Sequence, residues 1–146
     1  MRHRTTAAHR VHDIVQLVYV SRAVRELERF DLQQIIATSR LRNWRAGISG
    51  SLLSTGTQFA QVLEGRADAV QVLMGRIVRD ERHTSVRVAF QAPILKRAFP
   101  DWTMSCIFDP QLGCDIDDML GAPDISRAII AKLVDRMAAD AFLGTS

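Results

Sequence analysis

The amide side chain of Gln61 lies where a strand pattern calls for an apolar residue. Apolar side chains alternate from Phe59 to Leu63, and this period of two puts Gln61 on the same face as Phe59 and Leu63. A buried amide has two N–H donors and a carbonyl acceptor to satisfy, and leaving them unpaired costs roughly 1–3 kcal/mol. The pattern therefore predicts a polar group against Gln61.

A second polar series lies on a predicted helix. Asp31 and Gln34 form a capping-box pattern at its start, and Leu32, Ile35 and Ile36 form its apolar stripe. Ser39 and Asn43 continue that stripe in steps of three to four residues, so two polar side chains are expected on the core-facing side. One could belong to a helix end, whereas two in series indicate a polar object beneath the helix.

Four other residues carry chemistry but have simpler interpretations. Tyr19 is the only tyrosine, and composition alone favours an ordinary core tyrosine with a satisfied hydroxyl. Arg76 and Asp80 share a face of a helix predicted over Ala67–Asp80, where a surface ion pair is the simpler reading. His83 has no second His or Cys nearby to complete a metal site, so a structural hydrogen bond is expected.

The elements that must position these residues follow from apolar periodicity. Strands are predicted at Ile14–Val20, Ile48–Leu53, Phe59–Leu63, Val86–Ala92 and Trp102–Phe108, with a hairpin turn between the second and third. In the fourth strand Val86, Val88 and Phe90 are expected inward, and Arg87 and Gln91 outward. With the two helices, the order β-α-β-β-α-β-β predicts an α+β fold with a ferredoxin-like core and a five-stranded mixed sheet.

The C-terminal part differs in kind. Residues 110–123 read as turn-rich. An amphipathic helix is predicted over Asp124–Phe142, and its apolar face comprises Ile129, Ile130, Leu133, Val134, Met137 and Ala141. The first strand is apolar on both faces and so needs cover on both sides of the sheet. We expect the C-terminal helix to cover the sheet face opposite the two core helices.

Composition bounds the class of protein. The chain has 146 residues, which suits one domain, and no apolar run reaches membrane-spanning length. The net charge of +3 is spread along the chain without a basic stripe, so direct nucleic-acid binding is not expected. The two cysteines, Cys106 and Cys114, lack motif spacing and favour a reduced, cytoplasmic setting.

From Ile14 to Phe108 the sequence resembles the BLUF domain, a blue-light sensor that uses flavin. The segments that carry the resemblance together are Leu17–Ser21, Asp31–Ser39, Arg42–Asn43, Gly47–Gly50, Phe59–Gly65, Arg79–His83 and Phe99–Met104. The resemblance implies a flavin, FAD with FMN possible, between the two core helices and over the sheet. That flavin would be the polar object that Gln61, Ser39 and Asn43 require.

The resemblance also implies roles for individual residues. Tyr19 and Gln61 would be the photochemical pair, with Tyr19 as electron and proton donor and Gln61 as the amide that bridges it to the flavin. Asn43 would bind the pyrimidine edge of the flavin. The rest of the cofactor site would be lined by Ser39, Arg76, Asp80 and His83. Trp102 and Met104, on the fifth strand, would read out the rearrangement of Gln61.

Three segments are therefore expected: a flexible tail over residues 1–12, a photosensor domain over 13–109, and a linker with an output helix over 110–146. The leading hypothesis is a photoreceptor that is not an enzyme and has no effector domain of its own. It would signal to a separate effector, such as a cyclic-nucleotide enzyme or transcriptional regulator, and form a homo-oligomer. Two alternatives are a light-independent ferredoxin-like interaction module and a flavin-dependent oxidoreductase.

Overall fold

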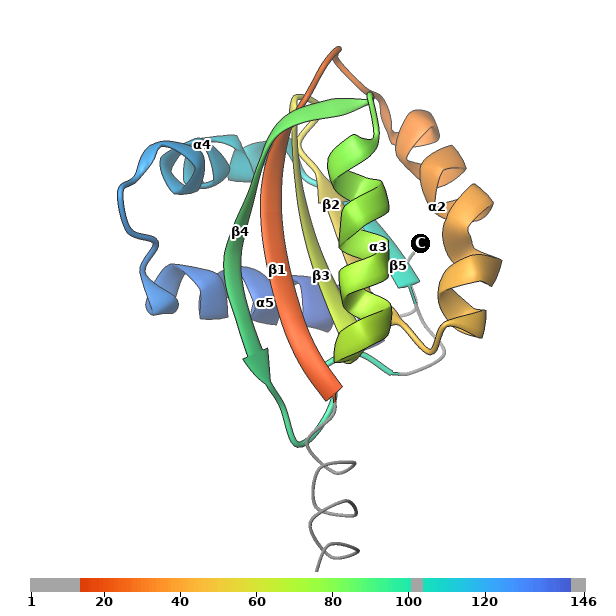
Figure 1. The fold of residues 1–146 in the computed structure, drawn as a ribbon. Coiled ribbons are helices and arrows are strands. Elements are labelled where there is room, and N and C mark those ends of the chain that lie inside the picture. The colour runs from red at the N-terminus through yellow and green to blue at the C-terminus, as the bar shows by residue number, and fades with distance from the viewer. Residues whose placement is uncertain (1–13, 101–103, 143–146) are drawn as a thin grey trace, which may run out of the picture.

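A five-stranded mixed sheet forms the centre of the molecule in a computed structural model, which describes residues 14–100 and 104–142 (Figure 1). The strands are β1 (Ile14–Ala23), β2 (Ser49–Ser54), β3 (Gln58–Arg66), β4 (His83–Pro93) and β5 (Met104–Phe108). Their order is β4-β1-β3-β2-β5; β5 runs parallel to β2, and the other neighbours are antiparallel. This confirms the predicted ferredoxin-like core. The predicted tail, residues 1–12, and Trp102 lie outside the described residues.

Helices cover both faces of this sheet. On one face lie α2 (Arg29–Arg45) and α3 (Ala67–Arg79), side by side with a space between them (Figure 1). On the other lie α4 (Gly113–Gly121), which follows a short 3-10 turn at Pro110–Leu112, and α5 (Arg127–Phe142). The expectation that the C-terminal helix covers the opposite sheet face is confirmed.

Two separate hydrophobic cores result from the alternation of side chains along the strands. Leu17 and Tyr19 of β1 belong to the core beneath α2 and α3, whereas Val18 and Val20 belong to the core beneath α4 and α5. The helices contribute Leu32, Ile36, Val70 and Met74 to the first core, and Ile116, Met119, Ile130, Leu133, Val134 and Met137 to the second. Each helix pair is therefore held to the sheet by burial of its apolar stripe.

The ends of α2 are fixed by local chemistry. The helix begins one turn earlier than predicted. Glu28 is the N-cap, and Asp31 occupies position N3 of the capping box rather than the N-cap. It ends where Gly47 takes a φ of +72°, a left-handed conformation that glycine adopts without steric cost. The Gly47 N–H then bonds to the Trp44 carbonyl oxygen at 3.0 Å. This end places Asn43 in the last turn.

The prediction for β4 was wrong in one respect. Val86 packs against the core beneath α2 and α3, but Val88 is 47% exposed, and Ala89 and Phe90 pack against the opposite core. The pairing of β1 with β4 shifts register between Val18 and Tyr19, which breaks the simple alternation. Arg87 is partly buried and donates to carbonyl oxygens of Met119, Ala122 and Pro123 around the end of α4.

The segment that was predicted as turns, residues 110–123, is largely helical. Ile116 and Met119 are buried three residues apart in α4, while Asp115, Asp117 and Asp118 are exposed on its outer side. The Asp, Gly and Pro residues of this segment favour turns, but Ile116 and Met119 are at helical spacing and form one buried face. Ile129 of α5 is 42% exposed rather than buried, and the side chain of Ala141 lies outside the described residues.

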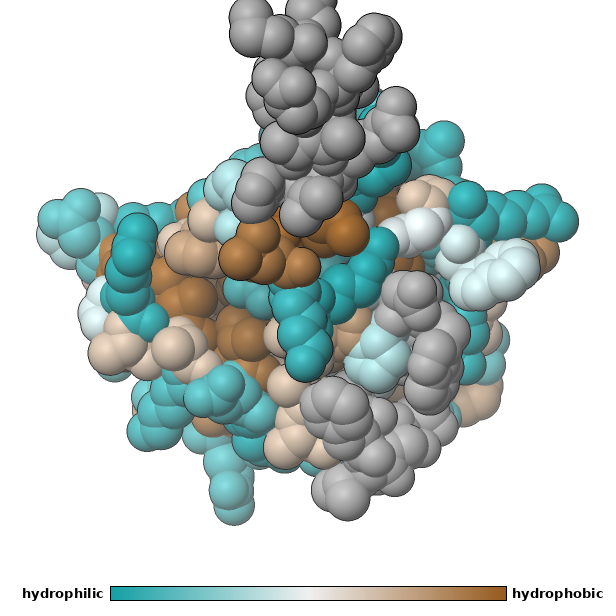
Figure 2. Space-filling model, turned by 90° about the horizontal axis from the view of Figure 1, so that it is seen from below, coloured by the Kyte–Doolittle hydropathy of each residue, from teal (hydrophilic) through white to brown (hydrophobic). Residues whose placement is uncertain are grey.

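Seen from below, the surface is mixed, with an area of hydrophobic side chains surrounded by hydrophilic ones (Figure 2). Among residues 14–100 and 104–142, no helix combines the length and the apolar character needed to cross a bilayer. Both cysteines are free, Cys106 buried and Cys114 exposed.

Candidate functional site

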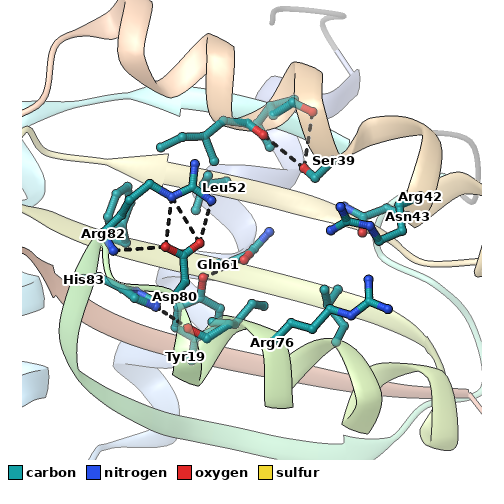
Figure 3. Close-up of a pocket in the computed structure, with 15 residues that line it drawn as sticks. Tyr19, Ser39, Arg42, Asn43, Leu52, Gln61, Arg76, Asp80, Arg82 and His83 are labelled. Carbon is teal, nitrogen blue, oxygen red and sulfur yellow. Dashed lines mark hydrogen bonds and ion pairs between the residues drawn. The ribbon is translucent and has the colours of Figure 1, made fainter.

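A pocket opens between α2 and α3 above the strands of the sheet (Figure 3). The space between the residues that line it is about 690 Å³, a volume that includes open solvent. Its apolar lining comprises Ile35, Ile36, Leu52, Phe59, Leu73 and Ile77, and its polar lining comprises Tyr19, Ser39, Arg42, Asn43, Gln61, Arg76, Asp80, Arg82 and His83. All seven predicted cofactor-site residues therefore line one pocket. Their individual roles remain predictions.

Tyr19 and Gln61 are joined at the floor of this pocket. They are paired across β1 and β3, and the Tyr19 hydroxyl donates to Gln61 Oε1 at 2.6 Å. Burial raises the pKa of Tyr19 above its ordinary value, the negative charge of Asp80 raises it further, and Arg82 acts in the opposite direction. Tyr19 is thus a protonated donor whose proton lies on the line to the Gln61 carbonyl.

The amide nitrogen of Gln61 has a much weaker partner. Gln61 Nε2 lies 3.7 Å from the sulfur of Met104, a poor acceptor. Met104 is 3% exposed and packs in the core beneath α2 and α3, next to Gln61; its predicted role in reading out Gln61 stays a prediction. Its backbone carbonyl oxygen also accepts from Arg40 Nη2 of α2 at 3.2 Å. Trp102, the other predicted output residue, lies outside the described residues.

The helix α2 supplies the polar edge of the pocket. Asn43 is 4% exposed, and its side-chain amide forms no hydrogen bond within residues 14–100 and 104–142. Ser39 donates its hydroxyl hydrogen to the carbonyl oxygens of Ile35 at 3.1 Å and Ile36 at 3.3 Å, which leaves its oxygen free to accept. The predicted polar series on α2 therefore does face a cavity.

Two guanidinium groups stand at the rim of the same end. Arg42 of α2 and Arg76 of α3 both line the pocket and lie toward the side where Asn43 is found (Figure 3). Neither forms an ion pair with an acidic group in the part of the chain that the structure describes. An excess of positive charge beside an unpaired amide is suited to a ligand with an anionic portion.

The other end of the pocket is electrically balanced. Asp80 pairs with Arg82 rather than with Arg76: Arg82 Nε donates at 2.9 Å to Asp80 Oδ1, and Nη2 donates at 2.5 Å to Oδ2. The simpler interpretation of these two residues, a surface Arg76–Asp80 ion pair, is therefore not what the structure shows, and both residues line the pocket. The hydrogen bonds from Arg82 hold the pKa of Asp80 below its usual value, against a smaller opposing effect of burial.

His83 lines the pocket with its ring, and its nitrogens are already used. The Ile77 carbonyl oxygen can only accept, so His83 Nε2 carries the hydrogen of that 2.6 Å bond, and Nδ1 accepts from the Ser21 hydroxyl at 2.8 Å. The ring meets Tyr19 and Phe59 edge to face at centroid distances of 6.1 Å and 5.9 Å. The expected structural hydrogen bond is present, and contact with a ligand is left to the ring carbons.

Sequence reasoning missed Arg42 and Arg82 as site residues. Each is adjacent in sequence to a predicted site residue, Arg42 to Asn43 and Arg82 to His83. Arg42 is one turn beyond Ser39 on the same helix, so helical spacing alone could have placed it at the pocket. Arg82 follows the end of α3, where no periodicity predicts the direction of a side chain.

A comparison with family models decides the class of this site. Residues 14–105, more than half of the chain, match the BLUF family, described as sensors of blue light using FAD. The chain belongs to the BLUF family. The matched domain is a sensor, and neither the flavin-dependent oxidoreductase nor the light-independent module is favoured.

Curated relatives of this BLUF chain are parts of much larger proteins. It is 39% identical over 100 residues to photoactivated adenylate cyclase subunit beta from Euglena gracilis, which covers 68% of this chain but 12% of that protein. It is 38% identical over 86 residues to the alpha subunit from the same organism, of which it covers 8%. The chain thus spans about a tenth of the length of these relatives.

Solved structures agree with this assignment. A structure of BlrB, described as a BLUF protein in its dark state, has a TM-score of 0.71 and 34% identity, covering 89% of this chain and 98% of that one. Klebsiella pneumoniae BlrP1, solved with calcium and cyclic diGMP, has a TM-score of 0.64 and 28% identity, and 34% of that chain is covered. The BLUF fold therefore accounts for most of this chain.

Proposed function

We propose that this BLUF chain binds one flavin, FAD, in the pocket between α2 and α3 and uses it to sense blue light. The observation that carries the proposal is the 2.6 Å hydrogen bond from buried Tyr19 to Gln61 at the pocket floor. The residues that line the pocket fit a flavin. Apolar walls from both helices suit its flat ring system, and the unpaired Asn43 amide suits the polar edge of that ring. The positive charges of Arg42 and Arg76 suit the phosphate groups of FAD.

Family membership supports FAD over FMN, since the family description names FAD. In the bound state the flavin supplies absorption of blue light and an acceptor for an electron. The remaining chemistry belongs to side chains of this chain. Asn43 and Ser39 orient the ligand from α2, and the His83 ring and Phe59 pack beside Tyr19.

Tyr19 and Gln61 form the switch. Tyr19 gives up an electron and a proton together only where an acceptor is within hydrogen-bond reach, and Gln61 Oε1 meets this condition. Exchange of the two ends of the Gln61 amide breaks the bond that its Oε1 accepts from Tyr19, but at Nε2 it gives up only the weak contact with the Met104 sulfur. After such an exchange the Gln61 NH₂ group, a donor, faces Tyr19 in place of the carbonyl oxygen. Met104 then faces the Gln61 carbonyl oxygen instead of the NH₂ group.

The signal then leaves through β5. Met104 touches Gln61 on one sheet face, and Ile107 of the same strand packs in the core that α5 covers. We propose that a change at Met104 alters how α5 docks and so reaches a separate effector. The names of the relatives, which are adenylate cyclase subunits, favour a cyclic-nucleotide enzyme over a transcriptional regulator as that effector. A homo-oligomer is also proposed.

The test is the absorption spectrum of the purified protein in the dark and under blue light. We expect a bound oxidised flavin and a small, reversible red shift on illumination. Tyr19→Phe and Gln61→Leu should each abolish the shift while flavin stays bound, because each removes one end of the 2.6 Å bond. Protein that stays colourless with excess FAD and FMN, or a variant that still cycles normally, would overturn the proposal.

A further inference from the structure

The outer face of α2 carries large apolar side chains that nothing in the described chain covers. Phe30 is 67% exposed, Leu41 57% and Trp44 60%. The buried residues of α2, Leu32, Ile36 and Asn43, lie on its other side, and α2 itself lies at the outside of the molecule (Figure 1). Exposed apolar side chains that gather on one face mark interaction surfaces more often than scattered ones do.

These residues follow the spacing of a helix–helix seam. From Phe30 the seam continues through Gln34, Ala37, Leu41 and Trp44, in steps of four, three, four and three residues. All five are exposed. The opposite side of α2 is separately buried through Leu32, Ile36 and Asn43, so this stripe is a second apolar face rather than part of the core. We call these five residues the outer seam.

Charges beside the outer seam identify its partner. Asp31, which also accepts the Glu28 backbone N–H at 2.9 Å and lies 3.8 Å from Arg25 of its own chain, follows Phe30 at one end, and Arg45 follows Trp44 at the other, so both lie on the same flank. A second copy of α2 in antiparallel orientation would bring Asp31 of each chain beside Arg45 of the other, twice by symmetry. A parallel copy would set these charges at opposite ends. On the other flank, Arg40 donates to the Met104 carbonyl oxygen of its own chain.

The same orientation matches side-chain sizes. With Asp31 beside Arg45, Ala37 of one chain lies in the layer of Leu41 of the other, and Gln34 lies in the layer of Trp44. A small side chain on one helix opposite a large side chain on the other lets the two helices approach closely. We propose that this chain forms an antiparallel homodimer through the outer seam of α2. One helix pair is a small interface, so the dimer is weak and depends on concentration.

The first test measures the molar mass of the protein by sedimentation at several concentrations. It compares a variant in the outer seam with a matched control variant outside it. Leu41→Glu should raise the dimer dissociation constant at least about tenfold, because a charge replaces an apolar side chain within the interface. Val72→Glu is the control, since Val72 is 63% exposed on α3 and lies outside the seam. A monomer at every concentration, or a dimer that both variants weaken equally or neither weakens, would overturn the proposal.

A cross-linking test decides the orientation. In the antiparallel pair, Thr38 of one chain lies beside Thr38 of the other on the Asp31–Arg45 flank, so Thr38→Cys in a Cys114→Ser background should form a disulfide dimer on oxidation. Gln33→Cys in the same background should not, because it lies on the other flank about 15 Å along the axis from its counterpart. Cross-linking only in a mixture of the two variants would indicate a parallel pair and overturn the proposal.

Discussion

At the scale of single residues, the unpaired amide of Asn43 carries the argument for a ligand. The Asn43 side chain lines the pocket and forms no hydrogen bond with any described residue, whereas Gln61 and Glu64 do; the buried hydroxyls of Ser51 and Ser105, which do not line the pocket, also lack partners. An amide that faces a pocket keeps its hydrogen-bonding groups available, and a ligand that enters the pocket can pair with them. The missing partner is consistent with a ligand that supplies it.

Substitution of Asn43 should therefore weaken cofactor retention more than it weakens the fold. We expect Asn43→Ala to raise the flavin dissociation constant about tenfold, since one hydrogen bond to a ligand is worth roughly 1.4 kcal/mol here. The measurement is flavin fluorescence on titration of the apoprotein. Gln33→Ala, an exposed change on the same helix, should leave the constant unchanged; equal effects of both variants would argue against the site.

The raised pKa of Tyr19 predicts how light sensing depends on pH. Because the folded pKa lies above the ordinary value of about 10, the phenol stays protonated, and its contribution to stability is present below about pH 10 and lost as the pH rises further. The amplitude of the light-induced shift should thus be constant from about pH 6 to pH 9. A titration of the amplitude with a midpoint near pH 8 would contradict the assignment of Tyr19.

At the scale of elements, the connection from β4 to β5 is fixed by one buried carboxylate. Glu64 of β3 is fully buried; it accepts from the backbone N–H of Phe99 at 2.9 Å and Ala98 at 3.1 Å, and from Gln16 Nε2 at 2.7 Å. Arg97 closes the connection from the other side by donating to Ser49 Oγ and to the Glu64 backbone carbonyl oxygen. The segment that leads into β5 is therefore attached to the strand that carries Gln61.

Glu64→Gln tests this attachment with almost no change of shape. The new amide NH₂ would face N–H donors instead of acceptors, so we expect a loss of about 1–3 kcal/mol in the free energy of unfolding, measured with urea. Glu81→Gln, on an exposed turn, is the control and should change stability by less than about 0.5 kcal/mol. Equal stability of the two variants would show that the carboxylate is replaceable.

At the scale of the whole molecule, the sheet separates the layer that holds the pocket from the layer formed by α4 and α5. The pocket belongs to the core beneath α2 and α3, and α5 belongs to the core on the opposite face. The sheet lies between the two, and β5 contributes Met104 to one side and Ile107 to the other. Close-packed strands pass on a displacement because interiors yield little.

Hydrogen exchange in dark and lit protein should therefore change on both sides of the sheet. We expect altered protection at Met104–Phe108 and in α5, Arg127–Phe142, and no change in either segment of the Gln61→Leu variant. Identical protection of both segments in the two states, with the spectral shift intact, would exclude this route for the signal.

The sequence by itself determined the layers of the fold and most of the polar residues around the pocket, although not Arg42 and Arg82. Apolar periodicity and turn residues are local, so they identified five strands, two core helices and the odd positions of Gln61, Ser39 and Asn43 before any contact was known. Alternation failed where pairing decided the geometry: Val88 is exposed because the register of β4 against β1 shifts, which no single strand encodes.

The tertiary structure alone decided which polar groups meet. Asp80 pairs with Arg82 rather than Arg76 because α3 ends at Arg79 and Asp80 is already extended, with φ −70° and ψ 123°, so the helical four-residue spacing does not apply. The Tyr19–Gln61 bond joins residues 42 positions apart through the pairing of β1 with β3. Which polar side chains pair depends on how distant segments of the chain pack together. Local sequence periodicity carries no information about that packing.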